Sequence, residues 1–365
     1  MKIERIQSQV VRLPADEPLA GGPAFGGPFR EFVTLQIETD AGIEGIGVTF
    51  FGAALTATLK VAVDQLGALI IGEDPLRVEA LGRKLHDSAA GSGPGGIFTL
   101  AFSAIDTALW DIKGKALGQP LAMLLGGLRE RVPTYASGAL MRTFTLAHVV
   151  KAASLLVEKG FRQMKMQLAL PGETLLEREV ERAKLIRQAI GAEVDLMCDI
   201  NQRWSVNQAI QIGRRLEEIH LYWLEDVTAH DDYMGLARVA EALVTPVAGG
   251  EYVYGITPFR HMLEARSVDI VMIDLLRVGG IANWMKVAGM AEAFNVPVVS
   301  HLFPEIHVHL MAAIPNGLTV EYMPWSLRLF EEVPVPVKGE LAVPSKPGLG
   351  LSFDRDIIKR YGIAT

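Results

Sequence analysis

The sequence is poor in the features that mark several classes of protein. It has a single cysteine, Cys198, so no disulfide can form within the chain, and this fits a reducing compartment. It contains no run of about 18 apolar residues, so we expect no segment that spans a membrane. The opening residues, MKIERIQSQVVRLP, lack the apolar stretch that follows the early charges of a secretory signal. We therefore expect a cytoplasmic protein.

An excess of positive charge is also missing. The formal net charge is −7, which gives no electrostatic footprint for nucleic acid or an anionic membrane. No glycine-rich dinucleotide fingerprint and no P-loop occur, so nucleotide binding has no support. The chain is 50% hydrophobic and 365 residues long, which is enough to bury a large core.

The first third of the chain has the pattern of an α+β domain. Ile3 to Leu13 and Phe32 to Glu38 are strand-like, and a DAG turn leads from the second into IEGIGVTF. The segment 21–29, GGPAFGGPF, is too rich in Gly and Pro to be regular. From residue 52 to about 118 the pattern is helical, with one apolar face made by Leu100, Ile105, Leu109 and Ile112. We assign residues 1–125 to this domain.

Eight short apolar runs follow, separated by helical stretches. They are VPTYAS (132–137), FRQMKM (161–166), VDLMCD (194–199), HLYWLE (220–225), TPVAGGE (245–251), VDIVMID (268–274), VPVVSH (296–301) and LTVE (318–321). Eight β/α units predict a parallel (β/α)8 barrel over residues 126–330. A doubly wound open sheet is the alternative, and the count of eight disfavours it. The Pro- and Gly-punctuated segment 331–365 is predicted to pack back onto the first domain.

Three consecutive predicted strands end on carboxylates: Asp199, Glu225 and Glu251. The carboxyl ends of barrel strands meet at one face, where three acids repel one another unless a cation neutralises them. All-oxygen ligation suits Mg²⁺. The alternative is that each acid caps the helix that follows, which explains one acid more easily than three at the same place in the repeat. The sequence thus predicts a magnesium site.

The next two strands end on Asp274 and His301. A carboxylate bonded to one ring nitrogen fixes the tautomer of a histidine and raises the basicity of the other nitrogen. The alternative is a packed core histidine. The position beside an acid and opposite the predicted metal ligands favours a catalytic base.

Lys165, Gln167 and Glu321 complete the polar set at the predicted strand ends. Lys165 and Gln167 are two residues apart, so both side chains point to the same face of their strand. A lysine inside the barrel is tolerated beside carboxylates and can bind a substrate carboxylate, whereas the alternative is a solvated lysine. Glu321 is expected to stay protonated near other acids and to donate a hydrogen bond to an enolate oxygen.

Several motifs resemble those of the mandelate racemase subgroup of the enolase superfamily. They are DINQRW (199–204), WLED (223–226), GGEY (249–252), MIDLLRVGG (272–280), SHLFPE (300–305) and PGLGL (347–351). The resemblance covers almost the whole chain. It implies that residues 1–125 cap a modified (β/α)7β barrel, and that the protein forms a homo-oligomer.

The resemblance also implies roles for individual residues. Asp199, Glu225 and Glu251 match the family's Mg²⁺ ligands, and Asp274 with His301 matches its acid/base dyad. Four further matches are Glu321 as hydrogen-bond donor to the substrate carboxylate, Lys165 as the first lysine of a K-x-K pair, Asn201 as a polar residue facing the substrate, and the loop with Phe25 and Phe29 as an apolar lid.

One departure from the family pattern bears on the reaction. The second lysine of K-x-K is Gln167 here, and a neutral amide cannot abstract a proton. With one base, His301, we favour dehydration of an acid sugar to a 2-keto-3-deoxy acid. The alternatives are racemisation or epimerisation of a 2-hydroxy acid, with Lys165 as second base, and a non-catalytic metal-binding barrel.

Overall fold

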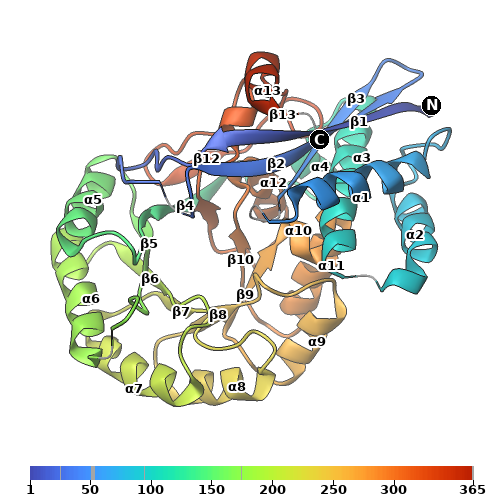
Figure 1. Cartoon of the computed structure of the whole chain (residues 1–365). Helices are drawn as coiled ribbons and strands as arrows, with labels where there is room; N and C mark the ends of the chain where they lie inside the picture. Colours follow the sequence, from blue (N-terminus) through green and yellow to red (C-terminus); the bar gives the residue numbers. More distant parts are fainter. Residues whose placement is uncertain (25, 51–53, 94, 174, 364–365) are drawn as a thin grey trace.

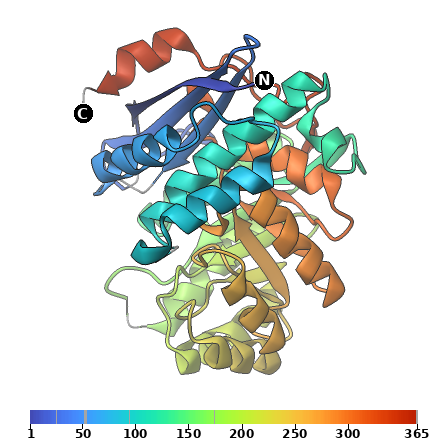
Figure 2. The same cartoon turned by 90° about the vertical axis from the view of Figure 1, so that its right-hand side faces the viewer.

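The computed structural model describes residues 1–24, 26–50, 54–93, 95–173 and 175–363. The chain opens with an antiparallel sheet in the order β13-β1-β2-β3, made of β1 (Ile3–Pro14), β2 (Phe29–Thr39), β3 (Glu44–Phe50) and, from the other end of the chain, β13 (Gly362–Ile363). Figure 2 shows this sheet and its helices stacked on the barrel. We call this part the capping domain.

A group of helices packs on the capping sheet and on one another. They are α1 (Thr56–Ala68), α2 (Val78–Ser88), α3 (Ile97–Ala116) and the one-turn α4 (Leu121–Leu124), with a 3₁₀ turn at Ala90–Ser92. Helix α3 lies directly on β3, and the apolar face predicted for it is buried. Gly45 and Gly47 allow this approach, because a Cβ at these positions would lie 2.2 and 2.1 Å from carbonyl oxygens of α3.

Eight parallel strands form the barrel, which confirms the predicted fold. They are β4 (Arg131–Leu140), β5 (Gln163–Gln167), β6 (Asp195–Asp199), β7 (Trp223–Glu225), β8 (Val247–Gly249), β9 (Ile270–Asp274), β10 (Val298–His301) and β11 (Val320–Tyr322). Strand β11 pairs with β4, whereas β10 meets the chain before β11 through an isolated bridge between Val298 and Gly317. The barrel is therefore nearly closed.

The helices between these strands form the outer wall (Figure 1). They are α5 (Leu146–Glu158), α6 (Leu176–Ile190), α7 (Val206–Leu216), α8 (Tyr233–Ala242), α9 (Thr257–Glu264), α10 (Leu275–Val278), α11 (Gly280–Ala293) and α12 (Pro304–Ala313), with 3₁₀ turns at Glu217–Ile219 and Leu327–Leu329. Among the described residues after β11, only the 3₁₀ turn Leu327–Leu329 stands where the eighth barrel helix is expected. No helix of the described chain is long and apolar enough to cross a membrane.

An apolar layer fills the middle of the barrel beneath the polar strand ends. Tyr135, Trp223 and Met272 belong to it and are fully buried, together with Met197, Ala248, Ile270 and Val299. The parallel register sets Asp199 beside both Gln167 and Glu225, and His301 beside Asp274. The site is thus built on a packed floor by the pairing of strands.

The last segment of the chain returns to both parts of the molecule. Strand β12 (Glu340–Ala342) pairs with the first half of β4, α13 (Arg355–Tyr361) lies on the capping sheet, and β13 pairs with β1. Asp111 of α3 ties this segment to the sheet, because its carboxylate accepts backbone hydrogen bonds from Leu349 at 2.9 Å and from Ile46 at 3.0 Å.

A second buried carboxylate of α3, Asp106, joins the capping domain to the barrel. Its Oδ2 accepts a hydrogen bond from the backbone N–H of Ala282, in the first turn of α11, at 3.2 Å. A Cβ at Gly280 would lie 2.5 Å from this oxygen, so the contact requires glycine. Burial raises the pKa of Asp106 to about 7.

Candidate active site

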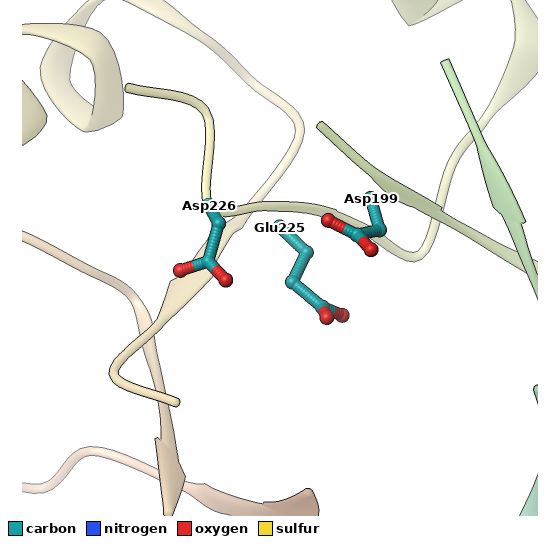
Figure 3. A group of neighbouring side chains, drawn as sticks. All are labelled: Asp199, Glu225 and Asp226. Atoms are coloured by element: carbon teal, nitrogen blue, oxygen red, sulfur yellow. The ribbon is translucent and has the colours of Figure 1, made fainter. Parts of the chain in front are cut away.

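A compact group of carboxylates lies at the carboxyl ends of β6 and β7. Asp199, Glu225 and Asp226 each offer an oxygen, and these oxygens all lie within 4.8 Å of one another. Figure 3 shows Asp199 and Asp226 on either side of Glu225. All three are buried, and Oδ2 of Asp226 has no hydrogen-bond partner among the described residues. A buried carboxylate oxygen without a donor, next to two other buried carboxylates, suits a hard divalent cation.

Sequence reasoning missed Asp226. It follows Glu225 directly, so regular alternation along the strand would turn its side chain to the outside of the barrel. Its backbone leaves β7 with φ of 45°, in the left-handed region, and this turns the carboxylate back toward Glu225. Burial, and then the charges of Glu225 and Asp199, raise the pKa of Asp226 well above its ordinary value. No signal in the sequence announces the turn.

Glu251 lies two residues beyond β8, next to the carboxylate group rather than within the 4.8 Å set. Its Oε2 is 3.3 Å from Nε2 of His301. Burial, followed by the charges of Asp226, Glu225 and Asp199, raises the pKa of Glu251 well above its usual range. Its carboxylate therefore lies between the acids of β6 and β7 and the histidine of β10.

Lys165 is buried inside the barrel with two carboxylates. Its Nζ lies 2.6 Å from Oε1 of Glu225 and 2.8 Å from Oε1 of Glu321. Burial alone lowers a lysine pKa, but the charges of Glu225 and Glu321 outweigh it and raise the pKa of Lys165 well above its ordinary value. Lys165 is thus a fixed positive charge in the site.

Glu321 differs from the expectation of a protonated acid. Burial raises its pKa, but the charges of Lys165 and His301 outweigh burial and lower the pKa to about 2. Its Oε2 accepts a hydrogen bond from the backbone N–H of Leu302 at 2.7 Å. Glu321 is thus a carboxylate here, because the ammonium beside it favours the charged form.

His301 and Asp274 form a close pair on adjacent strands. Nδ1 of His301 lies 2.6 Å from Oδ2 of Asp274, while Nε2 points toward Glu251. Oδ1 of Asp274 caps α10 through the backbone N–H groups of Leu276 and Arg277. Burial raises the pKa of Asp274, but Arg277 and His301 reverse this and lower the pKa to about 2. The dyad is held in one orientation, with Nε2 on the side of the Glu251 carboxylate.

Gln167 lies beside the acids of β6. Its Nε2 donates hydrogen bonds to Oδ2 of Asp199 at 3.1 Å and to Oδ1 of Asn201 at 3.0 Å. Arg142, just beyond β4, donates to the same oxygen of Asn201 at 2.6 Å and to the carbonyls of Asp199 and Ile200. Gln167 and Asn201 are thus locked to each other, and Arg142 is a second residue that sequence reasoning missed.

The two predicted lid residues have different outcomes. Phe25 lies outside the described residues. Phe29, the first residue of β2, is 49% exposed and lies 5.9 Å from the guanidinium of Arg12. Because alternate residues of a strand face opposite sides, Phe29 points away from the face that carries Arg30 and Phe32. The structure does not bring Phe29 to the polar group.

Two further histidines of the barrel are packed in the core. His307 and His309 are fully buried in α12, and burial lowers the pKa of each to about 4. His307 Nδ1 lies 2.7 Å from the carbonyl of Leu302, and His309 Nε2 lies 3.0 Å from that of Leu349. They support the loop after His301 and the return of the C-terminal segment.

This capped barrel, with carboxylates, a lysine and a His–Asp pair at its strand ends, defines an enzyme class that combines a cation site with a proton-transfer dyad. The "Mandelate racemase / muconate lactonizing enzyme, N-terminal domain" matches residues 29–126, and the "Enolase C-terminal domain-like" family matches residues 148–357. The chain belongs to this family, the mandelate racemase subgroup of the enolase superfamily.

Individual relatives are similar over nearly their full length. A 3,6-anhydro-alpha-L-galactonate cycloisomerase of Streptomyces coelicolor is 32% identical, with 99% of each chain covered. An L-talarate/galactarate dehydratase of Salmonella typhimurium is 31% identical over 96% of this chain and 89% of the relative. The crystal structure of L-talarate dehydratase from Polaromonas, complexed with Mg and L-glucarate, superposes with a TM-score of 0.91 at 30% identity, covering 100% of this chain and 98% of the other.

Proposed function

We propose that this protein is a Mg²⁺-dependent lyase that removes the α-proton of an acid sugar and eliminates the 3-hydroxyl, giving a 2-keto-3-deoxy acid. One observation carries this proposal: one face of the site holds a histidine base, and a neutral amide stands where a second base is needed for inversion. His301 Nε2 points into the site, while Gln167 is bound to Asp199 and Asn201. The proposed reaction therefore uses a single base.

The carboxylate group fits the metal that the reaction needs. Asp199, Glu225 and Glu251 would hold Mg²⁺, and the unpartnered Oδ2 of Asp226 lies next to them. When bound, Mg²⁺ supplies positive charge that lowers the energy of the ene-diolate. Lys165 adds a fixed positive charge on the same side, between Glu225 and Glu321.

The dyad performs the proton transfers in two steps. His301 Nε2 takes the proton from the α-carbon, and the electron pair of the broken C–H bond moves into the carboxylate. Asp274 holds Nδ1 and stabilises the imidazolium that forms. The electron pair then returns to form the C2–C3 double bond as the 3-oxygen leaves with the proton of His301. Water and an enol are released, and the enol becomes the 2-keto acid.

Isomerisation is a second candidate, favoured by the cycloisomerase relative from Streptomyces. A 3,6-anhydro sugar carries its 3-oxygen as an ether to carbon 6. Elimination then opens the ring but loses no water, so the product is an isomer of the substrate. The same dyad serves both reactions, and the substrate decides whether the outcome is dehydration or isomerisation.

The test is a panel of acid sugars with Mg²⁺, assayed for 2-keto product and for α-hydrogen exchange in D₂O. Dehydration gives a 2-keto acid with loss of water. Racemisation gives exchange and inversion without a 2-keto product, and this result would refute the single-base proposal. We further propose that the protein is cytoplasmic and a homo-oligomer, which fractionation and light scattering can check.

A further inference from the structure

The capping domain holds a buried cation, Arg30, at the start of β2. Its side chain is 8% exposed, and Nη1 donates one hydrogen bond to the carbonyl of Asp16 at 3.2 Å. It forms no ion pair within 4.0 Å in the described part of the chain. Burial lowers the pKa of Arg30 to about 10, so the guanidinium stays charged at neutral pH. A buried charge without a partner is unfavourable unless a ligand completes it.

The acids nearest to Arg30 are engaged elsewhere. The carboxylate of Asp16 lies 3.3 Å from Arg328, at the surface. The carboxylate of Glu17 accepts backbone hydrogen bonds from Leu19, Ala20 and Gly22. Their charges act on Arg30 from a distance, but neither carboxylate is directed at the guanidinium.

Arg30 lies over the rim of the barrel near β4 and β11. Its guanidinium carbon is 4.1 Å from the ring centroid of Trp325, which follows the site residue Glu321 by four positions. The indole of Trp325 also lies close to Gly138, in the last half of β4, because a Cβ built at Gly138 would be 3.9 Å from Nε1 of Trp325. The indole thus bridges the capping domain and the barrel mouth and supports one face of the guanidinium.

The same face of β2 also meets the loop that carries the base. Phe32, two residues after Arg30, has its ring centroid 6.5 Å from that of Phe303. Phe303 is two residues beyond His301. Contacts at two separate strand ends therefore place this face of β2, with Arg30, as part of the roof of the site.

Three other cations near the mouth have partners. Lys165 pairs with two carboxylates, and Arg277 lies 3.6 Å from Asp274 and donates to the carbonyl of Glu251. The terminal nitrogens of Arg142 donate to two carbonyls and to Asn201. Arg30 is the cation of this set that a ligand can use without breaking an existing contact.

We infer that Arg30 determines substrate class by binding the second carboxylate of a sugar diacid whose first carboxylate lies at the metal site and Lys165. The planar guanidinium offers paired N–H groups that match a carboxylate, and Trp325 fixes its plane. The inference rests on the proposed function and adds to it: the preferred substrates are aldaric acids rather than aldonic acids.

The experiment compares an aldaric acid with the aldonic acid of the same configuration, using wild type and Arg30→Gln with Mg²⁺. We expect Arg30→Gln to weaken calorimetric binding and kcat/KM of the diacid by about 10- to 100-fold, the loss of charge-assisted hydrogen bonds. The loss on the monoacid should be at least tenfold smaller. Arg30→Lys should restore part of the diacid preference through charge alone.

Arg12→Gln is the matched control, because Arg12 is an arginine of the same sheet, paired with Glu31 at the surface. This variant should leave the binding and the kcat/KM of both acids unchanged. If Arg30→Gln lowered kcat/KM equally for both acids, Arg30 would serve only as a contact between the domains, and the inference would be wrong. Turnover of monoacids with no preference for diacids in wild type would also overturn it while leaving the proposed function standing. Diacid binding that depends on Arg30, with no 2-keto product from any acid, would instead refute the proposed function.

Discussion

Replacing His301 by Asn tests the centre of the mechanism. The imidazole is the group that receives the α-proton, and the same group returns that proton to the leaving oxygen. Asn keeps the size and polarity of the side chain but cannot hold a proton. Lys165, Glu225 and Glu321 are untouched, so the binding end of the site remains intact.

The expected magnitude follows from the geometry of the dyad. General acid–base catalysis contributes about 10²- to 10⁴-fold, and His301 acts in both steps, so kcat should fall by at least about 10⁴-fold. Asp274→Asn should lower kcat less, because the imidazole remains. It still removes the 2.6 Å contact that fixes Nδ1 and the ion pair with Arg277, so the loss should exceed that of a surface substitution.

The assay separates proton transfer from elimination. In D₂O, wild type acting on a substrate analogue that lacks the 3-hydroxyl should exchange its α-hydrogen, and His301→Asn should not. Calorimetry should show that the analogue still binds to both proteins in the presence of Mg²⁺. Exchange at the wild-type rate in His301→Asn would refute the assignment of the base and would move it to Lys165, the other nitrogen base on the inner face.

Three further predictions follow from the same contacts. Glu225→Gln and Glu251→Gln should each abolish Mg²⁺-dependent activity and the rise in melting temperature that Mg²⁺ produces, while the fold survives; full activity of wild type in excess EDTA would contradict the metal site. Gln167→Lys places an amine where the second base is needed, but its neighbour Asp199 favours the charged ammonium, so α-hydrogen exchange on the second face should appear and stay slow. Racemisation by wild type would show that residue 167 does not control the stereochemical course. Burial raises the pKa of Asp106 to about 7 in the folded protein, so its contribution to stability is full at low pH and falls as pH rises from about 4 to 7. The melting temperature of Asp106→Asn should therefore rise relative to that of wild type across this pH range. Parallel pH profiles of the two melting temperatures would contradict the assignment.

The strand ends were the part of the site that the sequence could predict. Asp199, Glu225, Asp274 and His301 are the last residues of β6, β7, β9 and β10. A parallel barrel brings such ends together whatever their separation along the chain. The alternation of side chains along a strand was enough to place Lys165 inside the barrel.

The remaining features depend on backbone turns and on packing between domains. Asp226 enters the site through a left-handed residue that no pattern announces. Glu321 is ionised because Lys165 lies 2.8 Å away, a contact between strands far apart in sequence. Arg30 gains its position only when the capping sheet meets Trp325. Such contacts depend on which segments lie close together in three dimensions, and the periodicity of a single sequence does not predict that.

The two buried carboxylates of α3 have a consequence for how this architecture can be recombined. Asp106 needs a glycine at position 280 of the barrel, and Asp111 needs the backbone of Leu349 near the end of the chain. A chimaera that takes its first 125 residues from a relative therefore receives only one partner of each of these two contacts. The rest of the chain must supply a matching partner. These two contacts constrain any change of specificity that exchanges the whole capping domain. They do not constrain substitutions at single positions of the capping domain that face the site. Evolution and engineering of new substrates in this chain should accordingly proceed residue by residue within the existing roof.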